Sequence, residues 1–290
     1  MSKVFLVTGS GRGLGLHIAR AVLAAGHRLV AAARTTAQLD GLVDRHRDSI
    51  RPVSLDVTDP AAARAAVRTA VDAFGRLDVV VNNAGYANVA SVEDMTLEDF
   101  RAQVDTNLFG VVNVTKAALP VLRAQGHGHI IQVSSVGGRV TTPGLSAYSA
   151  AKWAVGGFSG VLAQEVAPLG IKVTVLEPGG MRTDWAGSSM SIAPVSEPYQ
   201  ATVGQMASLF SSAAGTSAGD PAKVAQVILR LTELESPPLR LLLGSDAVKY
   251  AAAVERAREQ SDANWRELSV STDHDEASAA EIDPLGHGPA

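Results

Sequence analysis

The sequence of 290 residues contains no cysteine. This absence excludes disulfide bonds, thiolate metal sites and cysteine nucleophiles. Any redox chemistry must therefore come from a bound cofactor. A chain without cysteine also fits a reducing compartment, and we expect a cytoplasmic protein.

Excess positive charge and long apolar runs are also missing. The formal net charge is −4 at pH 7, whereas binding to a nucleic-acid backbone needs clustered Lys and Arg. The first apolar run, residues 4–7, is interrupted by Thr8 and Gly9, and no stretch approaches the roughly 20 apolar residues that cross a bilayer. We therefore expect no nucleic-acid partner, no signal peptide and no membrane span.

The hydrophobic pattern is strong, since 46% of the residues are apolar. Short apolar runs alternate with longer Ala-rich segments of helical period, which is typical of parallel strands joined by crossover helices. The expected strands, all buried on both faces, are residues 4–7, 29–33, 53–55, 79–81, 129–133, 173–176 and 240–243. The expected helices are residues 14–25, 60–74, 97–123, 147–166 and 221–234. The pattern predicts an α/β protein of the Rossmann type, with a doubly wound, seven-stranded parallel sheet, helices on both faces and a ligand site at the carboxyl ends of the strands.

Two helix starts are marked by an N-cap signal, because Pro60 and Pro221 each follow an Asp. We expect a single large domain at 1–250, in which the regular pattern fails at about 183–219 and predicts a mobile lid. Residues 251–290 form an expected helical extension with an acidic tail. Its last part, 269–290, carries five acidic residues and no Lys or Arg, so we expect it to be mostly disordered.

A glycine-rich turn, TGSGRGLG at 8–15, follows the first expected strand. Glycine lets the backbone approach a pyrophosphate closely, and the helix that follows supplies free N–H groups and a partial positive charge. The spacing is TGxxxGxG rather than GxGxxG. A flexible turn would also account for a bare glycine cluster, but the strand before it and the helix after it favour dinucleotide binding.

The end of the second expected strand indicates which dinucleotide is bound. An NAD enzyme presents a carboxylate to the adenosine ribose at this point, but here the sequence reads Ala31-Ala32-Ala33-Arg34. Arg34 and Arg12 could together bind a 2′-phosphate. Either arginine could be merely solvated, but two at the expected places favour NADP(H) over NAD(H).

Tyr148 and Lys152 are four residues apart in an expected helix and therefore share a face. An ammonium beside the phenol would stabilise the phenolate and make Tyr148 a usable proton donor near neutral pH. Ser135, with Ser134 as the alternative, could donate a hydrogen bond to an oxygen that develops negative charge. Together with Asn107 upstream, these residues predict a carbonyl reductase, although each of them alone could be structural.

These motifs together resemble the short-chain dehydrogenase/reductase family, in its shorter single-domain branch, over residues 3 to about 245. They are the glycine turn, Leu55-Asp56-Val57, Asn82-Asn83-Ala84-Gly85, Asn107, Ser135, Tyr148 with Lys152, and Pro178-Gly179 followed by Thr183. The resemblance implies a catalytic tetrad of Asn107, Ser135, Tyr148 and Lys152. Ser135 is preferred to Ser134 because the family places 12 residues between the serine and the tyrosine, as here.

The resemblance further implies that Asn107 holds a water that relays protons to Lys152, and that Asp56 contacts adenine. The implied cofactor-binding residues are Thr8, Gly9, Ser10, Arg12, Gly13, Leu14, Gly15, Arg34, Asp56, Val57, Asn83, Ala84, Gly85, Tyr148, Lys152, Pro178, Gly179 and Thr183.

The implied activity is that of an NADP(H)-dependent oxidoreductase acting on a small-molecule carbonyl or secondary alcohol. The implied assembly is a homodimer or homotetramer through the helices that bear Asn107 and Tyr148. A catalytically silent NADP-sensing regulator is an alternative, but such proteins usually lose the tyrosine or the lysine. An epimerase- or dehydratase-type relative is another, but the roughly 45 residues after the last strand are few for its larger carboxyl-terminal domain.

Other residues carry weaker signals. His127 and His129 have no third ligand nearby in sequence, so we expect no metal site. Several apolar residues could form the walls of a pocket for a medium-sized hydrophobic substrate, or could simply pack the lid onto the domain: Trp185, Met190, Met206 and Phe210 on the lid, and Tyr86 and Val89 opposite.

Overall fold

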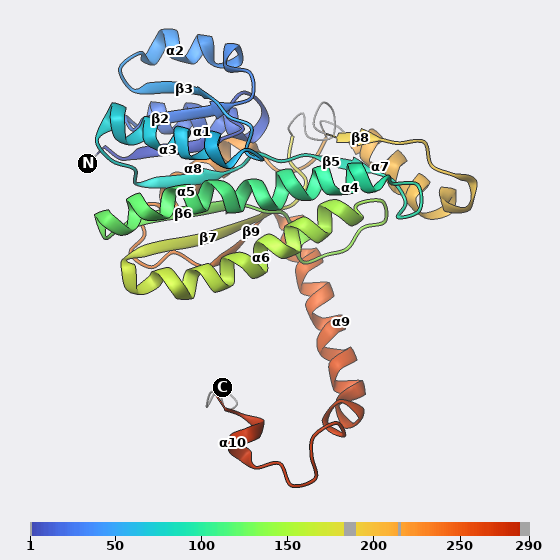
Figure 1. The fold of residues 1–290 in the computed structure, drawn as a ribbon. Helices are drawn as coiled ribbons and strands as arrows, with labels where there is room; N and C mark the ends of the chain where they lie inside the picture. The colour runs from blue at the N-terminus through green and yellow to red at the C-terminus, as the bar shows by residue number, and fades with distance from the viewer. Residues whose placement is uncertain (1, 183–189, 214–215, 285–290) are drawn as a thin grey trace. The chain divides into compact units, whose positions relative to one another are not determined.

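The computed structural model describes residues 2–182, 190–213 and 216–284 and contains a seven-stranded parallel sheet with helices on both faces (Figure 1). The strands of this sheet are β1 (Val4–Thr8), β2 (Arg28–Ala33), β3 (Ile50–Ser54), β4 (Val79–Asn82), β6 (Gly128–Val133), β7 (Ile171–Pro178) and β9 (Arg240–Leu243). All seven expected strands are present, and the predicted fold class is confirmed.

The helices alternate with the strands along the chain. They are α1 (Gly13–Ala24), α2 (Asp40–His46), α3 (Pro60–Phe74), α4 (Leu97–Val104), α5 (Gly110–Gln125), α6 (Ser146–Val166), α7 (Gln205–Ala213), α8 (Pro221–Leu231), α9 (Ser245–Val270) and α10 (Ala279–Ile282). None of the helices in the described ranges is long and apolar enough to span a membrane.

The strand order is β3-β2-β1-β4-β6-β7-β9. Strands β1 to β3 are added toward one edge of the sheet, and strands from β4 onward are added toward the other edge, starting beside β1. Phe5 pairs with Val79 across this junction, while Val4 pairs with Arg28 on the other side of β1. The chain therefore leaves β1 and β4 toward opposite faces of the sheet, and a crevice opens at their carboxyl ends. This switch point positions the site described below.

The two faces of the sheet bury separate cores. One core packs α1, α2 and α8 on the sheet, and Ile18 and Ile228 are fully buried in it. The other packs α3, α5 and α6, with Ala66, Val114 and Leu162 buried. Each large apolar side chain removed from water in this way stabilises the fold by about 1.5–3 kcal/mol.

The expectation that every strand is buried on both faces is wrong at the edges. Pro52 and Ser54 of β3 and Arg240 of β9 are exposed. Both strands have a single neighbour in the sheet, because β3 and β9 end the strand order. Edge strands are covered less completely, so polar residues can occupy them.

The two expected N-caps are confirmed. Asp59 Oδ1 accepts a hydrogen bond of 2.7 Å from the Ala61 amide at the start of α3. Asp220 Oδ1 accepts one of 2.8 Å from the Ala222 amide at the start of α8. In both helices proline occupies the first turn, where its missing N–H costs nothing.

The single helix expected at 97–123 is interrupted. α4 and α5 are separated by the π-helical turn η2 (Asp105–Phe109), which contains Asn107. Such a turn inserts an extra residue into the helical ladder without ending the apolar stripe, so periodicity does not reveal it. The segment expected to be irregular also contains regular elements: β8 (Met190–Ile192) pairs in parallel with β5 (Ala87–Val89), and α7 follows it.

The chain separates into two compact units, Met1–Tyr250 and Ala251–Ala290. α9 begins in the first unit and continues into the second. The second unit also contains α10, whose start carries a capping box between Ser278 and Glu281. Trp265 and Leu268 in this unit are exposed.

His129 of β6 is a buried titratable group outside the site. Its Nε2 atom lies 3.0 Å from the Thr174 hydroxyl, and its Nδ1 atom has no hydrogen-bond partner. Burial, assisted by the charges of Lys172 and Lys3, lowers the pKa of His129 to about 4. The folded protein therefore keeps this imidazole neutral at pH values where an unfolded chain binds a proton.

This difference predicts a loss of stability in acid. The unfolded histidine takes up a proton as the pH falls through 6.5, whereas the folded one does so only near pH 4. By pH 4 this difference in pKa should lower the free energy of unfolding by about 3 kcal/mol. Denaturant unfolding between pH 7 and pH 4 should show a smaller loss in His129→Gln than in the native sequence. His274→Gln, at an exposed histidine, is the control and should not change the slope.

Candidate active site

The glycine turn after β1 forms a cradle of backbone at the start of α1. Gly9 and Gly13 have φ values of +67° and +51°, which favour glycine. A side chain at Gly15 would overlap the Gly9 carbonyl, so the first turn of α1 packs directly on the loop. No acidic residue lies in that first turn, and the Arg12 side chain does not cap it. The free amides at this helix start fit the phosphates of a dinucleotide.

Thr8 and Ser10 lie behind this cradle and are not among the cavity-lining residues in the described ranges. Thr8 Oγ1 accepts hydrogen bonds from the Asn83 and Ala84 amides at 2.9 and 3.0 Å. Asn83 Nδ2 donates to the Thr8 carbonyl at 2.9 Å, and the Ser10 hydroxyl donates to the Val7 carbonyl at 2.7 Å. The Thr8 hydroxyl therefore holds the loops after β1 and β4 together, whereas the Ser10 hydroxyl closes the turn after β1 on itself.

A cavity of about 820 Å³ lies at the carboxyl ends of the strands. Of the predicted cofactor-binding residues, those that line it are Gly9, Arg12, Gly13, Leu14, Gly15, Arg34, Asp56, Val57, Asn83, Ala84, Gly85, Tyr148, Lys152, Pro178 and Gly179. Thr183 falls outside the described residues. All four members of the predicted tetrad also line the cavity.

One end of the cavity is polar and cationic. Arg12 and Arg34 line it, and no carboxylate follows β2 before Asp40. Asp56 accepts hydrogen bonds from the Thr58 amide at 2.9 Å and the Thr58 hydroxyl at 2.7 Å. These bonds, followed by the charge of Arg34, lower the pKa of Asp56. A carboxylate is therefore held ionised at this end, beside the arginine.

At the other end Asn107 is fixed by the backbone around it. Its Nδ2 atom donates to the carbonyls of Tyr86 and Gln103, each at 2.9 Å, and its Oδ1 atom accepts from the Tyr86 amide at 3.3 Å. A side chain at Gly85 would overlap that Oδ1 atom. The π turn thus places the Asn107 side chain in direct contact with Gly85 and Tyr86 in the loop after β4.

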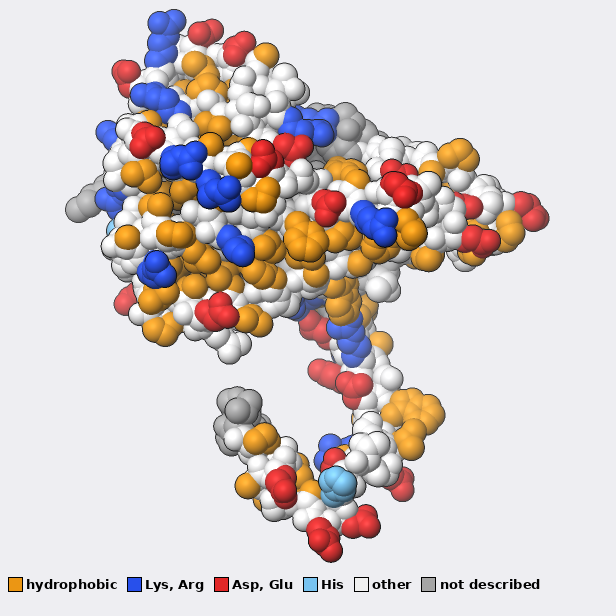
Figure 2. Space-filling view, in the orientation of Figure 1, with side chains coloured by type: hydrophobic (Ala, Val, Ile, Leu, Met, Phe, Trp, Pro, Cys, Tyr) orange, Lys and Arg blue, Asp and Glu red, His pale blue; other side chains and the backbone are white. Residues whose placement is uncertain are grey.

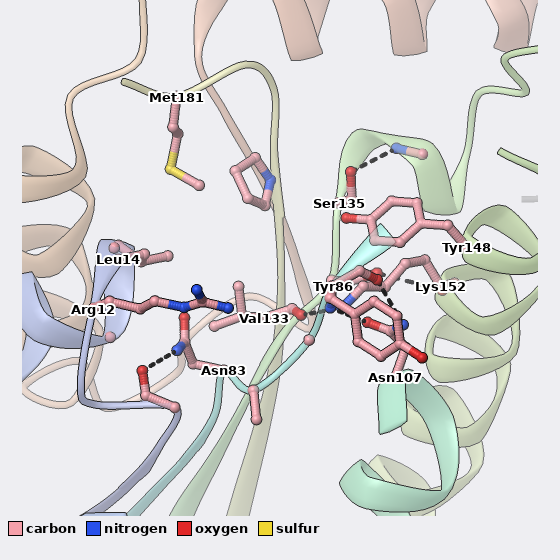
Figure 3. A pocket seen from close by; sticks show the side chains of 18 of the residues that line it. Arg12, Leu14, Asn83, Tyr86, Asn107, Val133, Ser135, Tyr148, Lys152 and Met181 are labelled. Atoms are coloured by element: carbon pink, nitrogen blue, oxygen red, sulfur yellow. Dashed lines mark hydrogen bonds between the residues drawn. The ribbon is translucent and has the colours of Figure 1, made fainter. Parts of the chain in front are cut away.

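Ser135, Tyr148 and Lys152 lie on the same side of the cavity as Asn107, opposite Arg12 and Leu14 (Figure 3). The Ser135 hydroxyl lies next to Tyr148 and acts to lower the pKa of its phenol, and its Oγ atom accepts from the Gly137 amide at 3.0 Å. Lys152 Nζ donates to the Val133 carbonyl at 2.9 Å and lies 5.6 Å from the centre of the Tyr148 ring. Ser134 instead donates to the Lys152 carbonyl at 3.3 Å, so Ser135 is the serine whose hydroxyl contacts Tyr148.

Burial dominates the protonation of this pair. It raises the pKa of Tyr148 to about 12, against the hydrogen bond from Ser135 that lowers it. It also lowers the pKa of Lys152 to about 8. The expected lowering of the phenol pKa by Lys152 is therefore not what this geometry gives. The loss of phenolate hydration on burial outweighs the stabilisation that the neighbouring groups give to the phenolate. The phenol therefore stays protonated at neutral pH.

The apolar wall of the cavity only partly matches the expected one. Tyr86 and Phe210 line the cavity, whereas Val89 is buried in a small core to which Met190 packs. Trp185 lies outside the described residues. Lining residues that the sequence did not single out include Gln38, Thr142, Leu145, Met181, Leu209 and Tyr250.

Gln38 is the most informative of these missed residues. It belongs to the short helical turn η1 (Thr36–Leu39), four residues beyond Arg34. A side chain at Gly11 would overlap its Oε1 atom, so the amide of Gln38 lies against the glycine turn. A polar residue shortly after Arg34 was the available signal.

His127 and His129 do not share a site. His127 Nε2 lies 3.2 Å from Asp78 Oδ1 at the other end of the sheet strands, whereas His129 contacts Thr174. Within the described ranges no three His, Cys, Asp or Glu side chains are grouped in a way that could hold a metal ion.

Comparison with known proteins identifies the family. A model of the short chain dehydrogenase family matches residues 3–191. Oxidoreductase BOA17 of Botryotinia fuckeliana (strain B05.10) is 56% identical over 273 residues, which are 94% of this chain and 100% of that protein. A short-chain dehydrogenase structure from Streptomyces avermitilis has a TM-score of 0.88 at 38% identity, and covers 94% of this chain and 100% of its own.

Solved relatives also bind dinucleotides. The alcohol dehydrogenase of the archaeon Thermococcus sibiricus, complexed with 5-hydroxy-NADP, has a TM-score of 0.69 at 25% identity, covering 84% of this chain and 96% of its own. A family member from Burkholderia phymatum in complex with NAD shares the fold, with a TM-score of 0.79 at 22% identity over 91% of this chain and 95% of its own. The family match, the glycine cradle and the cavity together lead to one conclusion. The chain belongs to the short-chain dehydrogenase/reductase family and is an oxidoreductase.

Proposed function

We propose that this protein transfers a hydride between NADP(H) and the carbonyl or secondary alcohol group of a small molecule, with Tyr148 as general acid and base. The observation that carries the proposal is that the side chains of Ser135 and Tyr148 lie next to each other in a cavity that also contains Lys152 (Figure 3). Two hydroxyls aimed at one point can hold a carbonyl oxygen and protonate it.

In the direction of reduction each group has a separate task. When bound, the nicotinamide supplies the hydride. The Ser135 hydroxyl donates its proton to the substrate oxygen, while its own oxygen accepts from the Gly137 amide. Tyr148 is protonated, since burial raises its pKa to about 12, and it gives that proton to the oxygen as negative charge develops.

Lys152 and Asn107 support the proton transfer. Lys152 lies on the same helix face as Tyr148, and its ammonium stabilises the phenolate left after the proton has gone. Because burial lowers the pKa of Lys152 to about 8, it can also return a proton. Asn107 would hold the water through which that proton is replaced. Its Oδ1 atom accepts one hydrogen bond and has room for a second.

Preference for NADP(H) is proposed from the other end of the cavity. Arg12 and Arg34 supply two guanidinium groups where a carboxylate would read an unphosphorylated ribose. The Gln38 amide lies against Gly11 of the glycine turn and lines the same cavity. The NADP-type ligand of the Thermococcus sibiricus relative is compatible with this proposal.

We also propose that the protein forms a homodimer or homotetramer. Apolar side chains gather over the surface formed by α5 and α6 (Figure 2). Among the large apolar residues exposed on these helices and on the π turn before α5 are Phe109, Trp153 and Val161. A second copy would bury this patch, whose exposure in a monomer is unfavourable.

The catalytic proposal predicts that Tyr148→Phe lowers kcat for ketone reduction by about a thousandfold, because the general acid is lost. NADPH affinity should be almost unchanged, since the ring remains. Steady-state assays on a ketone panel and fluorescence titration with NADPH measure the two quantities. Tyr199→Phe, at a tyrosine bonded to Glu93, is the control and should turn over like the native protein. Unchanged turnover in Tyr148→Phe would remove the assignment.

The cofactor proposal predicts that Arg34→Asp shifts the ratio of kcat/KM values for NADPH and NADH by about 10- to 100-fold toward NADH. The aspartate would repel the 2′-phosphate and accept hydrogen bonds from a ribose. Arg47→Asp makes the same charge change at an exposed residue that caps the end of α2. It should leave the ratio unchanged. An equal ratio in both variants would show that Arg34 does not read the phosphate.

The assembly proposal predicts that Val161→Glu produces a smaller particle than the native protein. A charge inside a buried apolar interface is costly, so the contact should fail. Size-exclusion chromatography with light scattering measures the mass. Leu234→Glu introduces the same charge at an exposed apolar residue after α8 and should keep the native mass. A monomeric native protein would contradict the proposal.

A further inference from the structure

A buried carboxylate lies beside the candidate active site. Glu177 immediately precedes Pro178 of the cavity wall, and its side chain is 1% exposed. Its Oε2 atom accepts a hydrogen bond from Arg139 Nε at 2.7 Å, and its Oε1 atom lies 3.5 Å from Arg240 Nε. A buried carboxylate requires its partners to be held in place. The three side chains therefore constrain the elements that carry them.

Arg139 links Glu177 to the loop of Ser135. The helical turn η3 (Val136–Gly138) begins directly after Ser135 and ends directly before Arg139. The Ser135 Oγ atom accepts from the Gly137 amide at the start of this turn, and the Arg139 amide donates to the Val136 carbonyl at its end at 2.8 Å. The ion pair to Glu177 thus anchors the far end of the turn that orients the Ser135 hydroxyl.

Arg240 links Glu177 to helix α6. A side chain at Gly156 would overlap the guanidinium of Arg240, so this group lies directly against the helix backbone. Gly156 follows Tyr148 and Lys152 at successive intervals of four residues and belongs to the same buried face. Arg240 therefore contacts α6 one turn beyond Lys152.

The two linked elements also touch each other. A Cβ atom at Gly138 would lie 3.0 Å from the Lys152 carbonyl oxygen, so η3 packs closely on α6. The Ser134 hydroxyl donates to the same carbonyl. A shift of η3 relative to α6 would change the separation of the Ser135 and Tyr148 hydroxyls, because Ser135 caps the start of η3 and Tyr148 lies on α6.

We propose that the Arg139–Glu177–Arg240 chain is a positioning device that sets the geometry between the Ser135 hydroxyl and the Tyr148–Lys152 face of α6. The three residues act through the elements they hold and do not touch the reacting atoms. The catalytic consequence rests on the proposed function. A displacement of about 1 Å in such a site can lower the rate by as much as about a hundredfold.

The test compares Arg139→Met with Arg76→Met. Arg76 also pairs with a buried carboxylate, that of Asp78, which lies at the amino end of the strands and away from the cavity. Both variants should unfold at a lower temperature than the native protein. Only Arg139→Met should lower kcat, by about tenfold, with KM for the carbonyl substrate nearly unchanged, because orientation matters most in the transition state. Arg139→Lys retains the charge and should recover part of the loss.

Hydrogen–deuterium exchange supplies a readout that does not depend on turnover. In Arg139→Met, amides of residues 134–140 should exchange faster than in the native protein, while NADPH affinity measured by calorimetry stays close to native. Arg240→Met should likewise speed exchange in 134–140 and lower kcat, and it replaces Arg139→Met if that variant does not fold. Arg76→Met should leave the exchange of this segment unchanged.

Two results would overturn the proposal. One is a kcat in Arg139→Met no lower than in Arg76→Met. The other is native exchange of residues 134–140 in a folded Arg139→Met or Arg240→Met protein. If the native protein reduces no carbonyl, the proposed function fails instead, and the exchange of residues 134–140 still decides whether the ion-pair chain holds the Ser135 loop.

Discussion

The burial of one face of α6 against β7 and the turn η3 constrains the whole site. Tyr148, Lys152 and Gly156 follow one another along this face, and all three are buried. Each meets a different part of the fold: the Ser135 hydroxyl, the Val133 carbonyl and the Arg240 guanidinium. A helix held at three successive turns cannot rotate without breaking several contacts, so its reactive side chains are fixed before any ligand arrives.

This burial also sets the charges. It acts in opposite directions on the two ionisable groups, because it raises the pKa of the phenol and lowers that of the amine. Both changes favour the neutral form. In the reduction that we propose, the protonated phenol is the form that gives up its proton, so this direction of the shift suits the proposed role. The lysine then titrates near physiological pH, where it can gain and lose protons readily.

Much of the fold could be predicted from the sequence because its signals are local. Each central strand is a short apolar run, and the caps of α3 and α8 are Asp-Pro pairs. The edges were less predictable, since the exposure of β3 depends on having no second neighbour, which its own residues do not specify. The π turn at Asn107 leaves the apolar stripe intact and was equally hidden.

The features of the site also fall into those that the sequence could predict and those that it could not. The glycine turn and the Tyr148–Lys152 pair could be predicted because their spacing along the chain is itself the signal, and the cavity brings these motifs together. Contacts between distant segments could not be predicted. Gln38 reaches the glycine turn only because η1 folds back. Glu177 meets Arg139 and Arg240 only because β7 lies between the loop after β6 and the edge strand β9. The direction of the Tyr148 pKa shift likewise depends on burial, which spacing cannot supply.

The two ends of the cavity are held by different kinds of interaction. At one end the cavity is lined by the glycine turn, by Arg12 and by the exposed Arg34, and glycines keep the backbone accessible. Changes there can alter which cofactor binds while α6 stays in place. At the other end the reactive hydroxyls are positioned by buried packing and by charge pairs that run into the sheet. Cofactor preference and catalytic geometry are therefore physically separable in this fold, because the groups that govern them share the cavity but not the contacts that hold them.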